Sequence, residues 1–163
     1  MKKKLLWIVL GLIVIIQFIR PTKNNNPEVS ANHIYSMYAT SNEVKTILDK
    51  ACNDCHSNVT KYPWYNNIQP IAWFVSHHVN EGKEHLNFSE FGNYNAKRQS
   101  KKLDEVIDEV KEGGMPLSSY TLIHTNAKLS QEEKTTLTQW AQSIMDSIKT
   151  KNPNMTSDEK ELH

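Results

Sequence analysis

Two cysteines and a histidine stand close together in the first half of the chain. Cys52, Cys55 and His56 lie in the segment KACNDCHSN, residues 50–58, and the sequence contains no other cysteine. Thiols followed by an imidazole are side chains that can hold a haem or a zinc ion, or form a redox-active disulfide. Three chemistries therefore compete: covalent attachment of a haem, thiol–disulfide exchange, and half of a zinc site.

The spacing of these residues favours haem attachment. Haem carries two vinyl groups on neighbouring pyrroles, and its iron needs an axial ligand. Residues at i, i+3 and i+4 share one face of a helical turn, so Cys52, Cys55 and His56 can form two thioether bonds and one iron–nitrogen bond. A redox dithiol is typical of a helix N-terminus in a βαβ setting, and a zinc site needs four ligands, for which only the adjacent His77 and His78 are candidates. Both remain as alternatives.

The elements that must position this motif are predicted to be helical. Thr40 with Glu43 forms a capping-box pattern before a helix that runs into Cys52, and Ser130 with Glu133 opens the last helix. Apolar residues at helical spacing predict helices over residues 44–51, 71–80, 103–110 and 131–148, while residues 80–95 and 115–129 are predicted as loops. No segment shows the period of a strand, so the predicted fold class is all-α.

An aromatic-rich stretch, YPWYNNIQPIAWF, surrounds two prolines that interrupt the helical pattern. Such a cluster is typical of plain hydrophobic core, and it could also pack against the face of a porphyrin. Its members are Tyr62, Trp64, Tyr65, Trp73 and Phe74. On the last helix, Trp140 belongs to the apolar face and is predicted to be structural.

The N-terminus has the pattern of an export signal. Three lysines at positions 2–4 precede the apolar run LLWIVLGLIVIIQFI, residues 5–19, which ends at Arg20. No small-x-small cleavage site follows this run. We therefore expect an uncleaved signal anchor, a single transmembrane helix over residues 1–20, with a cleaved signal peptide as the alternative. Its lysines would stay in the cytoplasm, which places the rest of the chain on the far side of the membrane.

Composition divides the remainder of the chain into three parts. Residues 21–39 contain two prolines and three consecutive asparagines and are predicted to be a linker. Residues 40–150 are predicted to form one domain. Residues 151–163 are polar and are predicted to be a disordered tail.

Composition and motifs exclude several classes of function. The formal net charge of +1 gives no support to nucleic-acid binding. The chain has no phosphate-binding glycine loop, no HExxH metalloprotease motif and no GxSxG nucleophile motif. The sequence therefore carries no sign of these classes of enzyme.

The order of the elements resembles that of small cytochromes c: a helix, CxxCH, a middle helix, a Gly-Gly-Met-Pro loop and a capped last helix. Over residues 40–145 the segments CHSNVTKYPWY, HHVNEGKEHLNFSEF and GGMPLSSYTLIHTNAKLS resemble the bacterial haem-binding domain family of exported monohaem proteins. The attachment motif of this family corresponds to Cys52, Cys55 and His56, which implies one covalently attached haem c with thioether bonds to the two cysteines. The resemblance to cytochromes c implies that His56 and Met115 are the axial ligands of the iron.

The sixth ligand and the function have alternatives. His78 is the other candidate for the sixth ligand, and a vacant sixth position is the third possibility. With Met115 bound, we expect single-electron transfer between redox partner proteins, for which Lys97, Arg98, Lys101 and Lys102 could dock an acidic partner. With an open or weakly held sixth position, the chain would be a haem-based sensor or binding module. A structural zinc module is the third class.

Overall fold

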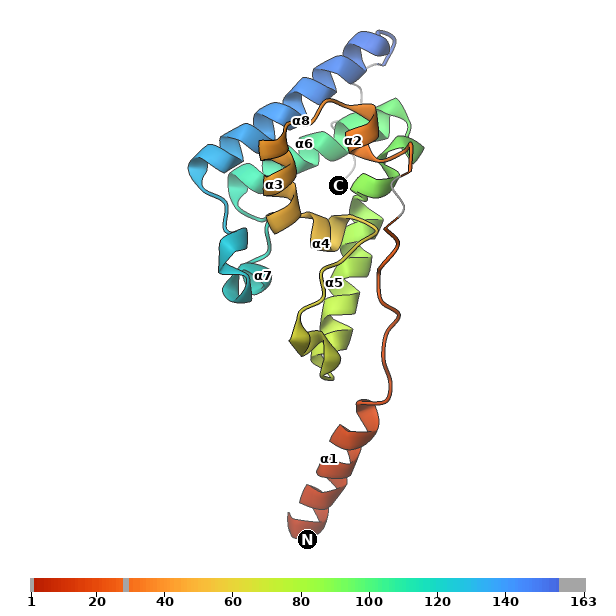
Figure 1. Ribbon diagram of the computed structural model, residues 1–163, viewed down its shortest axis with the longest axis vertical. Coiled ribbons are helices and arrows are strands. Elements are labelled where there is room, and N and C mark those ends of the chain that lie inside the picture. Colours follow the sequence, from red (N-terminus) through yellow and green to blue (C-terminus); the bar gives the residue numbers. More distant parts are fainter. Residues whose placement is uncertain (1, 28–29, 156–163) are drawn as a thin grey trace. The chain divides into compact units, whose positions relative to one another are not determined.

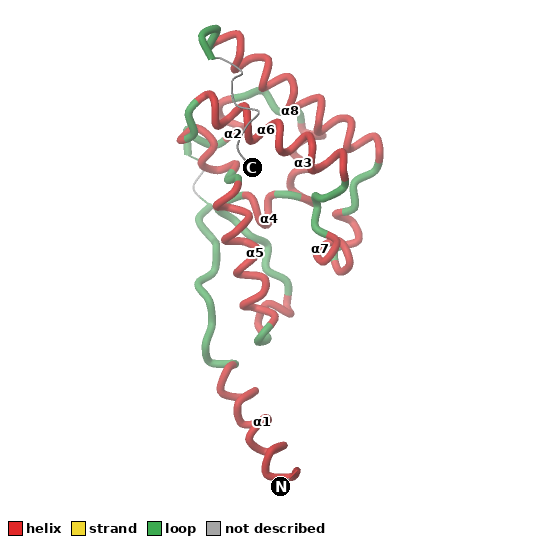
Figure 2. Tube along the Cα trace, turned by 180° about the vertical axis from the view of Figure 1, so that it is seen from behind, coloured by secondary structure: helices red, strands yellow, loops and turns green. Residues whose placement is uncertain are grey.

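The computed structural model describes residues 2–27 and 30–155, and these form helices joined by loops (Figure 1). The α-helices are α1 (Lys2–Ile16), α2 (Ile34–Met37), α3 (Asn42–Ala51), α4 (Asn53–His56), α5 (Ile71–His85), α6 (Ala96–Glu112), α7 (Ser118–Ile123) and α8 (Gln131–Lys151). Three short 3-10 helices join them: η1 (Trp64–Asn67), η2 (Phe88–Asn93) and η3 (Thr125–Ala127). Figure 2 shows helices and loops in this part of the chain and no strand. Among the described residues the only β-type pairing is one isolated antiparallel bridge between Asn25 and Val59. The all-α prediction is confirmed.

The chain folds into two compact units, each made of two segments. One unit contains residues 1–27 and 54–87, and the other contains residues 28–53 and 88–163. The boundary between residues 53 and 54 falls within α4, inside the CNDCH motif. We describe each unit by itself, and we call them the α5 unit and the α8 unit.

The long helices of the α8 unit are α6 and α8, which pack along each other. The first begins at Asn95, whose side-chain oxygen accepts a hydrogen bond from the Arg98 N–H at 2.9 Å. The second begins at Ser130, where the predicted capping box with Glu133 is present in both directions. Both bury one apolar face, and Trp140 is buried on α8 as predicted.

Helix α3 packs on α8 and leads directly to the CNDCH motif. Its N-cap is Ser41, whose hydroxyl accepts a hydrogen bond from the Val44 N–H at 3.2 Å. The predicted capping box at Thr40 is therefore wrong by one residue. Near the other end of α3, Lys50 Nζ lies 2.6 Å from Glu133 Oε1 at the start of α8. This pair fixes the last turn of α3 to the first turn of α8.

Two segments predicted as loops contain buried helical turns. The segment 80–95 continues α5 to His85 and then forms η2, in which Phe88 and Phe91 are buried. The segment 115–129 contains α7 and η3, and Ala127 of η3 is fully buried where η3 contacts α3. The loop predictions for these two segments are wrong, because short helical turns bury isolated apolar residues that show no period in the sequence.

In the α5 unit, η1 packs against α5. The residues that follow α4 pair with the segment after α1. Asn26 N–H donates to the Asn58 carbonyl at 2.9 Å, and Thr60 N–H donates to the Asn24 carbonyl at 3.0 Å. Residues 24–26 of the segment predicted as a linker therefore pair with the residues that follow CNDCH.

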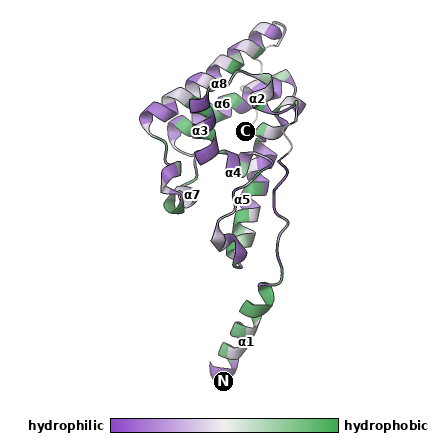
Figure 3. Ribbon diagram, viewed as in Figure 1, coloured by the Kyte–Doolittle hydropathy of each residue, from purple (hydrophilic) through white to green (hydrophobic). Residues whose placement is uncertain are grey.

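Helix α1 carries the apolar N-terminal run, and none of its side chains is buried (Figure 3). It is 15 residues long. Among the described residues, no helix has both the length and the apolar character that a membrane crossing requires. The predicted transmembrane helix over residues 1–20 is therefore not supported. Most of the predicted disordered tail, residues 156–163, lies outside the described residues.

Candidate functional site: the CNDCH turn

The CNDCH motif lies where α3 ends and α4 begins. Cys52 is the C-cap of α3, and its N–H donates to the Leu48 carbonyl at 2.9 Å. Cys55 and His56 are the last two residues of α4. Both cysteines lie within the described part of the chain, are partly buried, and form no disulfide there. The turn therefore holds two thiols and an imidazole without consuming any of them in a cross-link.

The His56 ring is held by the backbone at the end of α5. Its Nδ1 lies 2.9 Å from the carbonyl oxygen of Leu86, the C-cap residue of α5. A carbonyl oxygen only accepts, so Nδ1 carries the proton and the lone pair of the neutral ring lies on Nε2. Burial lowers the pKa of His56, while the Leu86 and Gly82 carbonyls oppose that shift. The ring is thus a neutral imidazole in a fixed tautomer, which is the form that binds a metal.

Gly82 lets α5 approach the attachment turn closely. A Cβ built on Gly82 would lie 2.7 Å from the carbonyl oxygen of Cys55 and 3.0 Å from its Cβ. No side chain larger than hydrogen fits there without moving Cys55 away from the helix. Sequence reasoning missed this contact, because Gly82 lies in a segment that was predicted as a loop.

The thiol of Cys55 is not activated as a nucleophile. Burial, with the Asp54 carboxylate adding to it, raises the pKa of Cys55 to about 11. Redox-active cysteines need a lowered pKa and usually stand at a helix N-terminus. Cys55 instead stands near the end of a four-residue helix. The dithiol alternative is not favoured by this environment.

Asn24 supports the turn from the segment after α1. Its Nδ2 donates to the Ser57 carbonyl at 2.9 Å and to Thr60 Oγ1 at 3.0 Å. Its Oδ1 accepts from Lys83 Nζ of α5 at 2.7 Å, and its backbone N–H donates to the Tyr62 hydroxyl at 2.7 Å. One side chain thus joins the residues after His56 to α5. Sequence reasoning missed it, because an asparagine in a polar triplet carries no sign of its partners.

Met115 lies in the α8 unit, just after the end of α6. Gly113 has a left-handed φ of 81°, and its N–H donates to the Glu109 carbonyl at 3.0 Å. The Met115 N–H donates to the same carbonyl at 3.1 Å, and the Met115 side chain is partly buried. The role of Gly113 is therefore to end α6 in a conformation that favours glycine, and this fixes the backbone of Met115.

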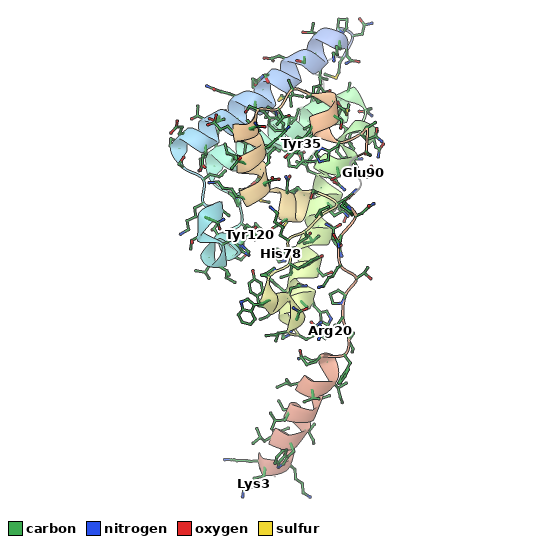
Figure 4. The ribbon with its side chains drawn as sticks, in the orientation of Figure 1. Lys3, Arg20, Tyr35, His78, Glu90 and Tyr120 are labelled. Atoms are coloured by element: carbon green, nitrogen blue, oxygen red, sulfur yellow. The ribbon has the colours of Figure 1, made fainter. Side chains whose placement is uncertain are left out.

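His78 lies on α5, in the same unit as Cys55 and His56 (Figure 4). Its Nδ1 lies 2.9 Å from the Phe74 carbonyl, and its ring is 4.1 Å from the Phe74 ring. It stands four residues before Gly82, on roughly the same face of the helix. Of the predicted site residues, Cys55, His56 and His78 belong to the α5 unit, and Cys52 and Met115 belong to the α8 unit.

Comparison with known proteins gives one match. The family model of the haem-binding domain matches residues 11–143, which is well over half of the chain. The chain belongs to the haem-binding domain family. A search of curated proteins and a search of solved structures found no match. The resemblance to the haem-binding domain family is therefore confirmed, and the likeness to cytochromes c stays a prediction.

The α5 unit of this haem-binding domain has features that suit the binding of haem. A histidine held in one tautomer by Leu86 offers Nε2 to iron, and an adjacent thiol on Cys55 is positioned by Gly82. Ile71 and Val75 lie within roughly 40° of Gly82 around α5, so they extend an apolar stripe along the same face. Ile71 is exposed and Val75 is partly buried. An apolar, planar ligand bound there would bury this stripe.

A zinc site is not supported by the same residues. The described residues contain no group of three or more histidine, cysteine, aspartate or glutamate side chains that could hold a metal ion. His77, one of the two histidines considered for zinc, lies 3.3 Å from Glu81 on the surface of α5. For a haem iron, His56 would be the ligand from this set, because the porphyrin brings nitrogen ligands of its own.

The aromatic stretch does not form a plain core. Trp64, Trp73 and Phe74 are all exposed. Phe74 lies beside His78, whereas Trp73 is nine residues from Gly82 and therefore half a turn away from the face that meets the CNDCH turn. The prediction that these side chains make ordinary core is wrong for these three.

Proposed function

We propose that this haem-binding domain carries one haem c, attached covalently through Cys52 and Cys55, with Nε2 of His56 as an axial ligand. The thiols of Cys52 and Cys55 would hold the haem through two thioether bonds, and His56 would supply a nitrogen ligand to its iron. The observation that carries this proposal is the 2.9 Å contact from His56 Nδ1 to the Leu86 carbonyl. It sets both the tautomer and the orientation of the ring that stands next to Cys55.

We infer that Met115 is the second axial ligand. The Glu109 carbonyl accepts hydrogen bonds from the backbone N–H groups of both Gly113 and Met115. These two bonds restrict the loop that carries the Met115 thioether. His78 is the alternative ligand. A thioether stabilises ferrous iron relative to a second imidazole, which would raise the reduction potential.

The function that follows is single-electron transfer between redox partner proteins, and not catalysis. When bound, haem supplies a one-electron couple at its iron. The protein contributes the two thiols, the two axial ligands and the apolar face that excludes water. The family match, which names haem binding, supports a carrier role.

We propose that the apolar N-terminal segment directs export and keeps the domain at the outer, periplasmic face of a bacterial cytoplasmic membrane. Covalent haem attachment takes place on that side. The exposed apolar side chains of α1 and the three lysines before them support this location.

A carbon monoxide difference spectrum of the reduced, full-length chain tests the electron-transfer proposal. The protein is exported together with the c-type maturation machinery and kept in detergent. We expect a weak response, because a protein ligand fills the sixth position. A strong response at low carbon monoxide would instead establish an open or weakly held site and favour the sensor alternative.

A further inference from the structure

Within the α5 unit, the residues that follow α1 are held by the buried amide of Gln69. Gln69 is only 4% exposed. Its backbone N–H donates to Gln17 Oε1 at 2.9 Å, and Gln17 Nε2 donates back to the Gln69 carbonyl at 3.3 Å. The Ile19 carbonyl accepts from Gln69 Nε2 at 2.8 Å and from Trp73 Nε1 at 3.0 Å. These hydrogen bonds join the residues just after α1 to the residues at the beginning of α5.

Exposed apolar side chains surround this attachment. We call them the clamp patch, and they are Phe18, Ile19, Trp64, Ile68 and Trp73. Trp64 is 76% exposed and Phe18 is 83% exposed. Soluble proteins rarely expose contiguous large apolar side chains without a binding purpose. In the sequence, the patch residues Phe18 and Ile19 follow α1, whose large apolar side chains from Leu5 to Ile15 are also exposed.

The N-terminal segment that contributes Phe18 and Ile19 to the patch carries only positive charges. Residues 1–27 contain five basic side chains and no acidic one, whereas the whole chain has a net charge of only +1. Lys3 and Arg20 lie near the two ends of the apolar segment (Figure 4). Tryptophans beside lysine and arginine are typical of the boundary between lipid headgroups and acyl chains. Basic side chains at that boundary favour anionic lipids.

We propose that the clamp patch rests on the surface of a lipid bilayer, at the headgroup boundary, beside the apolar side chains of α1. Because the hydrogen bonds of Gln69 hold Gln17 and Ile19 in place, the bilayer contact is made by the folded α5 unit and not by a flexible tail. The attachment turn meets α5 at Gly82, half a turn away from Trp73, so the patch and the CNDCH turn use different faces of α5. This proposal is independent of the proposed haem chemistry, since the patch contains none of the residues proposed to bind haem.

Fluorescence quenching by brominated lipids tests this contact in the full-length, haem-loaded chain. A first variant, Trp7→Phe with Trp140→Phe, keeps only the two indoles of the patch. A control variant, Trp7→Phe with Trp64→Phe and Trp73→Phe, keeps only the buried Trp140. On vesicles containing anionic lipid we expect lipids brominated near the headgroup to reduce the patch emission about twofold, and more than lipids brominated near the chain ends. Emission from Trp140 should not change.

Vesicle sedimentation supplies the second measurement. Trp64→Ser with Ile68→Ser should weaken binding about tenfold, because two apolar side chains lose their contact with lipid. Leu122→Ser with Ile123→Ser removes a comparably exposed apolar pair from the α8 unit and should leave binding unchanged. The proposal is overturned if the wild-type chain does not sediment with vesicles, if sedimented protein shows no quenching of the patch indoles, or if both double variants lose binding equally.

Discussion

The Nδ1 atom of His56 lies 2.9 Å from the carbonyl oxygen of Leu86, at the point where α5 ends. This contact joins the attachment turn to a helix that begins 15 residues after it. The end of α5 supplies two groups to the attachment turn. The Leu86 carbonyl is the acceptor for His56, and Gly82 is the residue against which Cys55 packs.

Gly82→Ala is expected to disturb the attachment turn. The added Cβ would lie 2.7 Å from the Cys55 carbonyl oxygen, so α4 must move, at a cost of about 1–3 kcal/mol in the free energy of unfolding. The free energy of unfolding, measured with urea, and the haem content of the exported protein should both fall. Gly11→Ala is the matched control, because nothing lies within 4 Å of its Cβ position. Equal behaviour of the two variants would contradict the proposed close packing.

Asn24→Ala is expected to loosen the residues that follow His56. The variant loses the hydrogen bonds to Ser57 and Thr60 and removes the acceptor of Lys83, which should lower the free energy of unfolding by about 1–3 kcal/mol. Asn25→Ala replaces an exposed neighbour in the same triplet and should change the free energy of unfolding by less than about 0.5 kcal/mol. If the Asn25 variant were the more destabilised one, Asn24 would not be the support of this turn.

Met115→Leu is expected to remove the sulfur ligand while nearly keeping the side-chain volume. The weak far-red absorption band of sulfur-ligated ferric haem should disappear, and the reduction potential should fall on the order of 0.1 V, within the about 0.8 V range that axial ligands span. Met37→Leu on α2 serves as the control and should keep the band. Absence of the band in the wild type would move the assignment to His78 or to an open position, whereas its retention in the Met115 variant would assign the sulfur ligand to another methionine.

Glu133 is expected to make stability depend on pH in the acidic range. The hydrogen bond from Lys50, with those from Ser130, lowers the pKa of Glu133 below its ordinary value of 4.5. A carboxyl whose pKa is lower in the folded state stabilises the fold above its unfolded pKa, and this contribution is lost as the pH falls through the folded pKa. Both side chains of the Lys50–Glu133 pair are partly exposed, so its contribution is at most about 1 kcal/mol.

Urea unfolding at neutral pH and near pH 3.5 measures this contribution. Glu133→Gln should be less stable than the wild type at neutral pH, and the difference should shrink in acid. Glu132→Gln removes a charge from the same first turn of α8 and should keep the wild-type pH dependence of Glu133. A gap between Glu133→Gln and wild type that stays constant with pH would show that the ion pair does not contribute.

The helix ends with strong side-chain signals were predictable from the sequence. Ser130 with Glu133 begins α8, and Gly113 ends α6, because each combines a specific backbone conformation with a residue type that favours it. Helix α3 was placed correctly apart from its N-cap. Thr40 and Ser41 both carry a hydroxyl, and only the backbone geometry decides which of them caps the helix.

Much of the site depends on groups that leave no mark in a sequence. The Leu86 carbonyl is a backbone atom that every residue type has, so no pattern could identify it as the partner of His56. The partners of Asn24 lie 33 or more residues away along the chain. Phe88 and Phe91 are buried in a 3-10 helix, where apolar residues follow neither the helical nor the strand period.

The mass of the intact protein after extraction with acidified acetone tests the central claim most directly. The full-length chain is exported with the c-type maturation machinery, and a variant with both Cys52→Ala and Cys55→Ala is prepared in parallel. We predict that the wild type keeps the added mass of one haem through two thioether bonds and that the double variant has the mass of the polypeptide alone. A wild-type chain that has the bare polypeptide mass, with its haem in the solvent or with no haem at all, would contradict covalent attachment at CNDCH.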